Sequence, residues 1–227
     1  MAVSVQLPSG PVTVTVTTAW EEPSGASRGV VAIAHGAGAG MDHPFLIGFS
    51  AALRAEGFTT VRFTFPYVEA GRRMPGPAAH AVLTWRAVVA SIRSERPDAA
   101  IWACGKSYGG RMASMAVSEG LEVDGLVYLG YPLHPPGKPD KPRVEHLPIV
   151  RPPQLFVEGT NDPFVQPLSQ LEEAVASCRD ARIAWIDGGG HSFEVKGAKR
   201  PADVVGAELA PLVVAFIDKV ERRHAQR

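Results

Sequence analysis

The chain has 227 residues, 45% of them hydrophobic and 20% charged, which is enough apolar material for one sizeable core. Lysines plus arginines number 23 and aspartates plus glutamates also 23, so the net charge is zero and argues against a nucleic-acid or acidic-membrane binder. Two cysteines, Cys104 and Cys178, are too few for a disulfide framework and lack metal-ligand spacing. This usage favours a reducing, cytoplasmic compartment.

The chain shows no targeting or membrane-spanning signal. Its first eight residues lack the basic start and apolar run of a secretory signal. No later stretch approaches the roughly 20 apolar residues that span a bilayer. We therefore expect a single domain over residues 1–227 with no membrane partner.

The first elements in chain order predict a hairpin. Val12–Thr17 is β-branched at every position, which is typical of a half-buried strand. Val3–Leu7 is the expected antiparallel partner, with a turn around Pro8–Pro11.

From Gly29 onward, short apolar runs alternate with helical stretches. The runs are Val30–Ala34, Thr59–Phe65, Ala99–Cys104, Gly125–Leu129, Gln154–Val157 and Arg182–Ile186, and the helices cover about residues 45–56, 78–95, 107–119, 167–177 and 202–222. Wholly apolar runs are typical of strands covered on both sides. The sequence predicts an α/β fold: a mostly parallel, doubly wound sheet with helices on both faces and no cap domain.

A serine stands between the run that ends at Cys104 and the helix that follows it. In Gly105–Gly110 the serine is Ser107, with glycines two residues to either side. A tight strand-to-helix turn strains the backbone of such a serine and presents its hydroxyl at the sheet edge. A glycine-rich turn with a capping serine is the structural alternative. The context favours a nucleophile.

An acid and a histidine follow later strand ends. Asp162 lies 55 positions after Ser107, and His191 lies 29 positions after Asp162, behind three glycines. Taken alone, Asp162 is typical of an Asx turn before Pro163, and a lone loop histidine is typically exposed. The order serine, acid, histidine at separate strand ends is that of the α/β-hydrolase triad.

A small-residue loop follows the first apolar run. His35–Gly40 occupies the position that supplies an oxyanion donor, so the N–H groups of Ala37 and Tyr108 are the expected oxyanion hole. We expect His35 to be structural. Asp42 is expected near the N-cap of the next helix, with Pro44 in its first turn.

Five motifs carry a family resemblance, namely His35–Gly38, Gly105–Gly110, Gly130–Pro139, Gly159–Asp162 and Gly190–Phe193. They resemble compact α/β hydrolases related to dienelactone hydrolase, over about residues 28–220. The Tyr131–Lys138 stretch more narrowly resembles the branch of testis-expressed hydrolase-like proteins and the hydrolase-like subunit of the NSL chromatin complex. The resemblance implies an eight-stranded sheet and a Ser107–Asp162–His191 triad.

The resemblance has one departure. Dienelactone hydrolase uses a cysteine nucleophile, whereas this chain has Ser107, and Cys104 is expected to be buried and inert. We therefore expect a serine hydrolase that cleaves a small ester or thioester through an acyl-enzyme, with no cofactor or metal. A catalytically idle interaction module, and a peptidase or acyltransferase with the same triad, are the alternatives.

The proline-rich loop Tyr131–Pro153 is the expected stiff wall of an open, shallow site. The candidate substrate contacts are His43, Tyr67, Arg72, Arg73 and His134.

Overall fold

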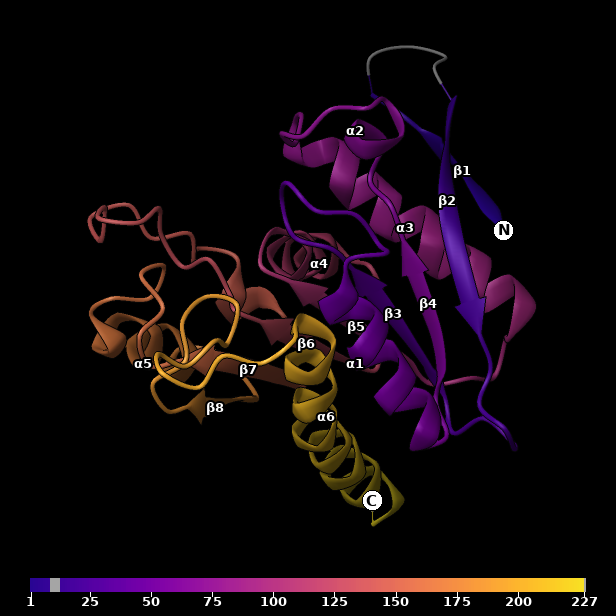
Figure 1. Ribbon diagram of the computed structural model, residues 1–227. Helices are drawn as coiled ribbons and strands as arrows, with labels where there is room; N and C mark the ends of the chain where they lie inside the picture. The colour runs from indigo at the N-terminus through magenta and orange to yellow at the C-terminus, as the bar shows by residue number, and fades with distance from the viewer. Residues whose placement is uncertain (9–12, 227) are drawn as a thin grey trace.

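The centre of the molecule is one eight-stranded sheet with the order β1-β2-β4-β3-β5-β6-β7-β8 (Figure 1). The computed structural model describes residues 1–8 and 13–226. The strands are β1 (Ala2–Gln6), β2 (Thr13–Glu21), β3 (Val30–Ala34), β4 (Thr59–Phe63), β5 (Ile101–Lys106), β6 (Gly125–Leu129), β7 (Gln154–Gly159) and β8 (Ala181–Ile186).

Strand directions confirm the predicted fold. β1 pairs antiparallel with β2, and β2 pairs antiparallel with β4, whereas the pairs from β4 to β8 are parallel. The predicted pairing of the first two strands is therefore correct, although most of the turn predicted at Pro8–Pro11 lies outside the described residues. From β3 onward, each strand boundary lies within two residues of its predicted position.

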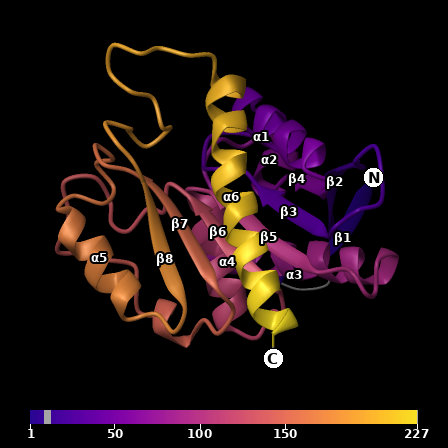
Figure 2. The same ribbon diagram turned by 90° about the horizontal axis from the view of Figure 1, so that it is seen from below.

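Helices cover both faces of the sheet (Figures 1 and 2). They are α1 (Pro44–Ala55), α2 (Pro66–Glu69), α3 (Ala78–Glu95), α4 (Tyr108–Ser118), α5 (Leu168–Ala176) and α6 (Ala202–Ala225), with a 3-10 turn at Leu147–Ile149. Alternate residues of β3 face opposite sides. Val31 and Ile33 pack with α1 and α6, whereas Val30 and Ala32 pack with α3 and α4. The sequence reading missed α2 and the 3-10 turn because one turn shows no helical period.

Burial follows position in the sheet. Residues of the inner strands β3, β4, β6 and β7 are all buried, as their apolar runs predicted. β8 also has an apolar run, but each of its residues is only partly buried because it is the edge strand. An apolar run therefore did not by itself distinguish an inner strand from an edge strand.

Helices α1 and α6 approach each other very closely. A Cβ at Gly48 would lie 2.0 Å from Asp203 O, and a Cβ at Gly206 would lie 2.0 Å from Phe45 O. Only glycine leaves room for such backbone contact. The N-terminal ends of both helices are thereby brought together beside the carboxyl ends of the strands, where ligands of such sheets bind.

Among the described residues, none of the helices combines the length and the apolar character needed to cross a bilayer.

Candidate active site

Ser107 occupies a strained turn between β5 and α4. Its φ is +49° and its ψ −114°, values that a residue with a side chain rarely adopts. The flanking glycines are required by space, because a Cβ at Gly105 would lie 2.2 Å from Gly110 N and one at Gly109 would lie 2.6 Å from His35 O. The turn has the geometry of a nucleophile elbow, not of a capping serine, since the Ser107 side chain makes no cap hydrogen bond.

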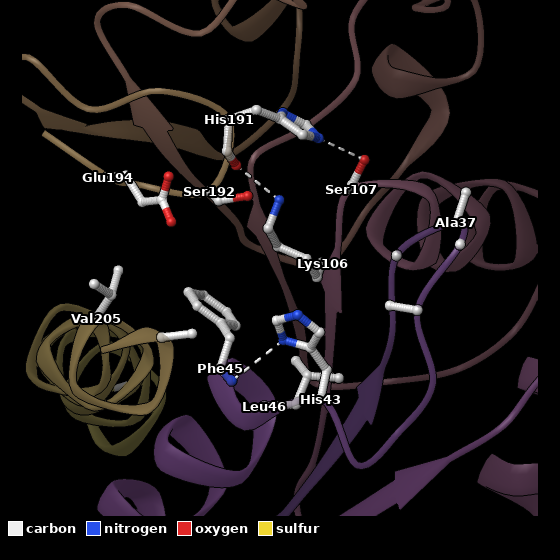
Figure 3. Close-up of a pocket in the computed structure, with 14 residues that line it drawn as sticks. Ala37, His43, Phe45, Leu46, Lys106, Ser107, His191, Ser192, Glu194 and Val205 are labelled. Carbon is white, nitrogen blue, oxygen red and sulfur yellow. Dashed lines mark hydrogen bonds between the residues drawn. The ribbon is translucent and has the colours of Figure 1, made fainter. Parts of the chain in front are cut away.

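His191 links Ser107 to Asp162, and Figure 3 shows its contact with Ser107. The Ser107 hydroxyl lies 2.8 Å from His191 Nε2, where it donates to the ring, and the Nδ1–H donates to Asp162 Oδ2 over 2.6 Å. The three side chains come from the ends of β5, β7 and β8, which are distant in sequence. The fold brings these three predicted residues into one chain of hydrogen bonds.

Asp162 is held as a hydrogen-bond acceptor. It is fully buried, and its Oδ1 accepts from Phe164 N–H at 2.8 Å while Oδ2 faces the imidazole. The hydrogen bond from Phe164 N–H has the form of an Asx turn. The Asp162 side chain therefore makes both the predicted turn, through Oδ1, and the contact with His191, through Oδ2. The Phe164 ring packs on the imidazole with centroids 4.2 Å apart, which fixes the ring plane.

The surroundings of His191 favour its neutral form. Burial lowers the pKa of the imidazole, and the Lys106 charge lowers it further, while the hydrogen bond to Asp162 acts in the opposite direction. A neutral ring with its proton on Nδ1 has a free lone pair on Nε2, so it is ready to take a proton from Ser107.

The Gly36–Ala39 turn lies against the serine. Its closing hydrogen bond runs from Ala39 N–H to Gly36 O over 3.3 Å, and Gly38 supplies a φ of +76°. A Cβ at Gly36 would lie 3.5 Å from Ser107 Cβ, so the turn passes directly beside Ser107. Tyr108 is the first residue of α4, where an N–H has no acceptor within its own helix.

His35 is buried and its side chain stabilises the Gly36–Ala39 turn. Its Nδ1–H donates to Gly36 O at 2.8 Å, and its Nε2 accepts from Phe65 N–H at 3.2 Å. Burial lowers the pKa of the ring, which keeps it neutral. The structural role predicted for His35 agrees with these contacts.

A pocket of about 440 Å³ opens between Ser107, the Gly36–Ala39 turn and the first turns of α1 and α6 (Figure 3). Its apolar wall includes Phe45, Leu46, Ala202 and Val205. The polar lining includes Lys106, His191, Ser192 and Glu194.

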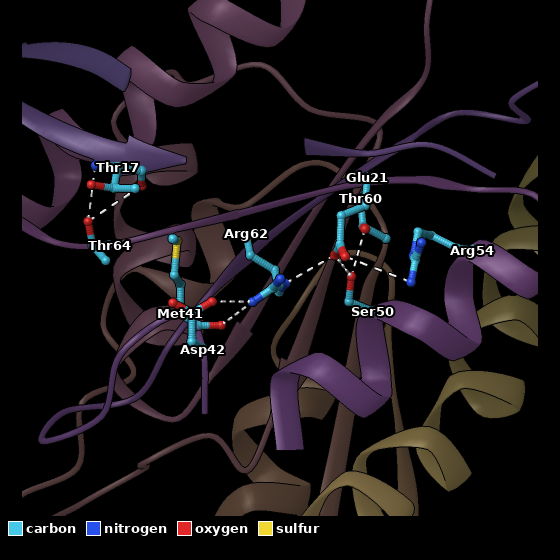
Figure 4. A network of polar contacts seen from close by, with 9 residues as sticks. All are labelled: Thr17, Glu21, Met41, Asp42, Ser50, Arg54, Thr60, Arg62 and Thr64. Atoms are coloured by element: carbon cyan, nitrogen blue, oxygen red, sulfur yellow. Dashed lines mark hydrogen bonds and ion pairs between the residues drawn. The ribbon is translucent and has the colours of Figure 1, made fainter. Parts of the chain in front are cut away.

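Of the five candidate substrate contacts, the structure places only His43 in the lining of this pocket. His43 is also the N-cap of α1, since its Nδ1 accepts from Phe45 N–H at 3.3 Å. Asp42, expected near the N-cap, is the residue directly before it, and the capping contact comes from His43. Asp42 instead pairs with the buried Arg62 at 2.9 Å, which also binds Met41 O (Figure 4).

The other four candidates are not part of the pocket lining. Tyr67 is buried against His35. Arg72 and Arg73 are exposed in the segment after α2. His134 is 1% exposed, and each ring nitrogen lies 2.8 Å from a main-chain carbonyl oxygen.

The proline-rich loop does not form the expected wall of this pocket. Its apolar residues Tyr131, Leu133, Leu147 and Val150 are buried in the core that contains α3 and α4. None of the described residues 131–153 lines the pocket beside Ser107. Proline content predicted stiffness, but only packing decided which part of the molecule the loop covers.

Sequence reasoning missed two ionisable groups: Lys106, which is partly exposed and lines the pocket, and Glu158, which is buried. Lys106 Nζ donates to His191 O at 2.8 Å. Glu158 is fully buried, and its Oε1 accepts from Tyr131 N–H. Lys106 is the last residue of β5, and Glu158 is the last but one of β7; a charged residue in such a mainly apolar run is the signal that could have found them. Cys104, in contrast, is buried as predicted, and burial raises the pKa of its thiol.

Comparisons with known proteins agree with this architecture. The fold is similar to that of an alpha-beta serine hydrolase homologue from Coxiella burnetii, with 21% identity, a TM-score of 0.73, and 95% of this chain and 96% of that chain covered. It is also similar to that of a serine hydrolase without lid from Xanthomonas campestris, with 23% identity and a TM-score of 0.68. The match covers 92% of this chain and 91% of that chain. A dienelactone hydrolase from Anabaena variabilis has 23% identity and a TM-score of 0.69, with 92% and 94% covered.

These similarities concern the fold. The sequence itself matches a family, the alpha/beta hydrolase domain, over residues 27–217, a span that includes Ser107, Asp162 and His191. The chain therefore belongs to the alpha/beta hydrolase domain family.

Proposed function

We propose that this protein is a serine hydrolase that cleaves a small ester or thioester. The observation that carries the proposal is the chain of two hydrogen bonds, 2.8 Å from Ser107 Oγ to His191 Nε2 and 2.6 Å from His191 Nδ1 to Asp162 Oδ2. This is the arrangement that activates a serine for acyl transfer. The strained turn at Ser107 and the burial that lowers the pKa of His191 support it further.

In the proposed reaction, Ser107 Oγ attacks the acyl carbon while His191 Nε2 takes the hydroxyl proton. Asp162 stabilises the imidazolium that forms. The N–H groups of Ala37 and Tyr108 bind the oxyanion, and a donor of this kind typically lowers the barrier by about 3–4 kcal/mol. His191 then protonates the leaving alcohol or thiol, and the acyl group stays on Ser107. Water, deprotonated by His191, releases the acid and restores the serine.

The pocket supports a small substrate. Its volume of about 440 Å³ lies toward the lower end of the range for small-molecule sites. The apolar wall made by Phe45, Leu46 and Val205 suits a short acyl chain. We propose that residues 1–227 act as one cytoplasmic domain without a separate cap, like the Xanthomonas protein described as lacking a lid. We also propose that the chain belongs to the narrower branch that the Tyr131–Lys138 stretch resembles, that of the testis-expressed hydrolase-like proteins and the hydrolase-like subunit of the NSL chromatin complex.

Two alternatives are less well supported. An idle interaction module has no need of a strained serine, yet Ser107 keeps a φ of +49° within hydrogen-bond reach of His191. A peptidase or acyltransferase would use the same three side chains, and substrate tests distinguish it from an esterase.

A fluorophosphonate probe is expected to label Ser107 within minutes, because only an activated serine reacts quickly. Peptide mapping by mass spectrometry locates the adduct. The chain contains its own control, since Ser114 also lies 2.7 Å from a histidine, His146 Nε2, but is fully buried. Absence of labelling in the folded protein, or an adduct on another serine, would overturn the proposal.

Pocket size predicts a preference for short acyl chains. We expect kcat/KM for p-nitrophenyl acetate and butyrate to exceed that for the palmitate ester, and Ala202→Phe to reduce hexanoate hydrolysis more than acetate hydrolysis. Ala202 lines the pocket, whereas Val204 is exposed on the same turn of α6, so Val204→Phe is the matched control. A preference for palmitate, or equal losses in both variants, contradicts this substrate class.

A further inference from the structure

Lys106 connects β5, the nucleophile strand that ends directly before Ser107, to the loop that carries His191. This histidine loop runs from residue 187 to residue 201, between β8 and α6. Lys106 is the last residue of β5, and it lies opposite Leu129 of β6 in the sheet register. Its side chain turns into the pocket, where Nζ donates to the main-chain oxygen of His191 over 2.8 Å (Figure 3). The residue before the nucleophile thus holds the backbone of the residue that activates the nucleophile.

The histidine loop needs such an anchor. Three glycines, Gly188–Gly190, precede His191, and glycine gives a backbone more freedom than any other residue. Phe193 continues the loop at a φ of +62° and packs on Phe45 of α1, with Lys106 Nζ 5.6 Å above the Phe193 ring. The backbone of Lys106 belongs to a central strand of the sheet, so the lysine ties the loop to a rigid part of the fold.

The ammonium group lies in a charged setting. Burial lowers the pKa of Lys106 to about 8, while the charge of Asp162, three residues after β7, opposes this shift. Glu158 is fully buried, and burial raises its pKa, which favours a neutral carboxyl. Glu194, from the histidine loop, and His43, at the start of α1, line the same pocket.

We propose that Lys106 is a positioning residue, whose ammonium group fastens the His191 backbone to the nucleophile strand and keeps the imidazole in its neutral form. The inference rests on the proposed function and adds a residue to its machinery. A positive charge beside an imidazole disfavours a second positive charge on the ring, so the lysine keeps His191 Nε2 free to accept the Ser107 proton at lower pH.

The position of Lys106 favours this role over binding of an anionic substrate. Its ammonium group donates to the main-chain oxygen of His191 and so is engaged by the protein itself. The Glu194 carboxylate lines the same pocket and would repel an anion. Lys106 therefore acts through His191 and should affect kcat more than KM.

The test compares Lys106→Met, which keeps length and loses the charge and its donors, with Lys106→Arg, which keeps both. For Lys106→Met we expect kcat on p-nitrophenyl acetate at pH 7 to fall about 10²-fold with little change in KM, because small misplacement of a catalytic group costs this much. The acidic limb of the kcat/KM profile should move to higher pH, because loss of the cation raises the pKa of His191. In Lys106→Arg, kcat and the acidic limb of the kcat/KM profile should both lie near the parent values.

A second readout does not depend on turnover. NMR titration of the His191 ring, assigned with His191→Gln, should show a higher pKa in Lys106→Met than in the parent. A higher pKa in a protein that the fluorophosphonate probe does not label would uphold the role of Lys106 and reject the proposed hydrolase activity. An unchanged His191 titration, or an effect on KM alone, overturns the role of Lys106. Lys196→Met, at an exposed position of the same loop, controls for the loss of any lysine.

Discussion

Ser107→Ala is expected to lower kcat for p-nitrophenyl acetate by about 10⁶-fold, the scale seen when a hydrolase nucleophile is removed. Without Oγ no acyl-enzyme forms, and only binding and the oxyanion donors remain. The protein should stay folded, because alanine keeps the same Cβ in the turn at φ +49° and the lost bond, to His191 Nε2, is a single contact. Initial rates on purified protein, with thermal unfolding by circular dichroism, measure both effects.

The matched control is Ser118→Ala, at the other end of α4. The Ser118 hydroxyl donates to Met115 O of its own helix and lies outside the pocket lining, so the rate should stay near that of the parent. Rates of Ser107→Ala within tenfold of the parent, in preparations free of contaminating esterases, would remove Ser107 from the mechanism.

Asp162→Asn is expected to lower kcat by about 10⁴-fold through the wrong tautomer of His191. Phe164 N–H donates to Oδ1 at 2.8 Å, so the asparagine carbonyl will take that position and its NH₂ group will face His191 Nδ1. Nδ1 must then accept, which moves the ring proton to Nε2, opposite Ser107 Oγ. The ring can no longer take the serine proton. Pre-steady-state release of p-nitrophenol measures this acylation step directly.

Asp187→Asn is the control for loss of an acid at the same sheet edge. Asp187 is exposed and accepts a long bond of 3.5 Å from Thr160 Oγ1, so the rate of Asp187→Asn should stay near that of the parent. If Asp162→Asn kept parental acylation rates, Asp162 would serve only the turn at Pro163.

The local pattern of the chain determined the elements and the identity of the three central side chains. Apolar runs such as Val30–Ala34 predicted strands at their observed bounds, because a strand covered on both faces cannot alternate with polar residues. Glycines two residues to either side of Ser107 predicted the tight turn, because a Cβ there would overlap backbone. These are short-range requirements, so they are readable from neighbours in the sequence.

Tertiary structure decided what surrounds those side chains. Backbone contact at Gly48 and Gly206 brings two distant helices together, so the site acquires a wall made by α1 and α6. Lys106 likewise meets the main-chain oxygen of His191, which lies 85 positions further along the chain. On the other face of the sheet, the core that contains α3 and α4 buries the apolar residues of the proline-rich loop, and His134 contacts Gln166 O instead of lining the pocket. A residue type states which contacts a side chain can make. Which of those contacts the side chain does make depends on segments that are distant in the sequence, and these segments meet only when the chain packs.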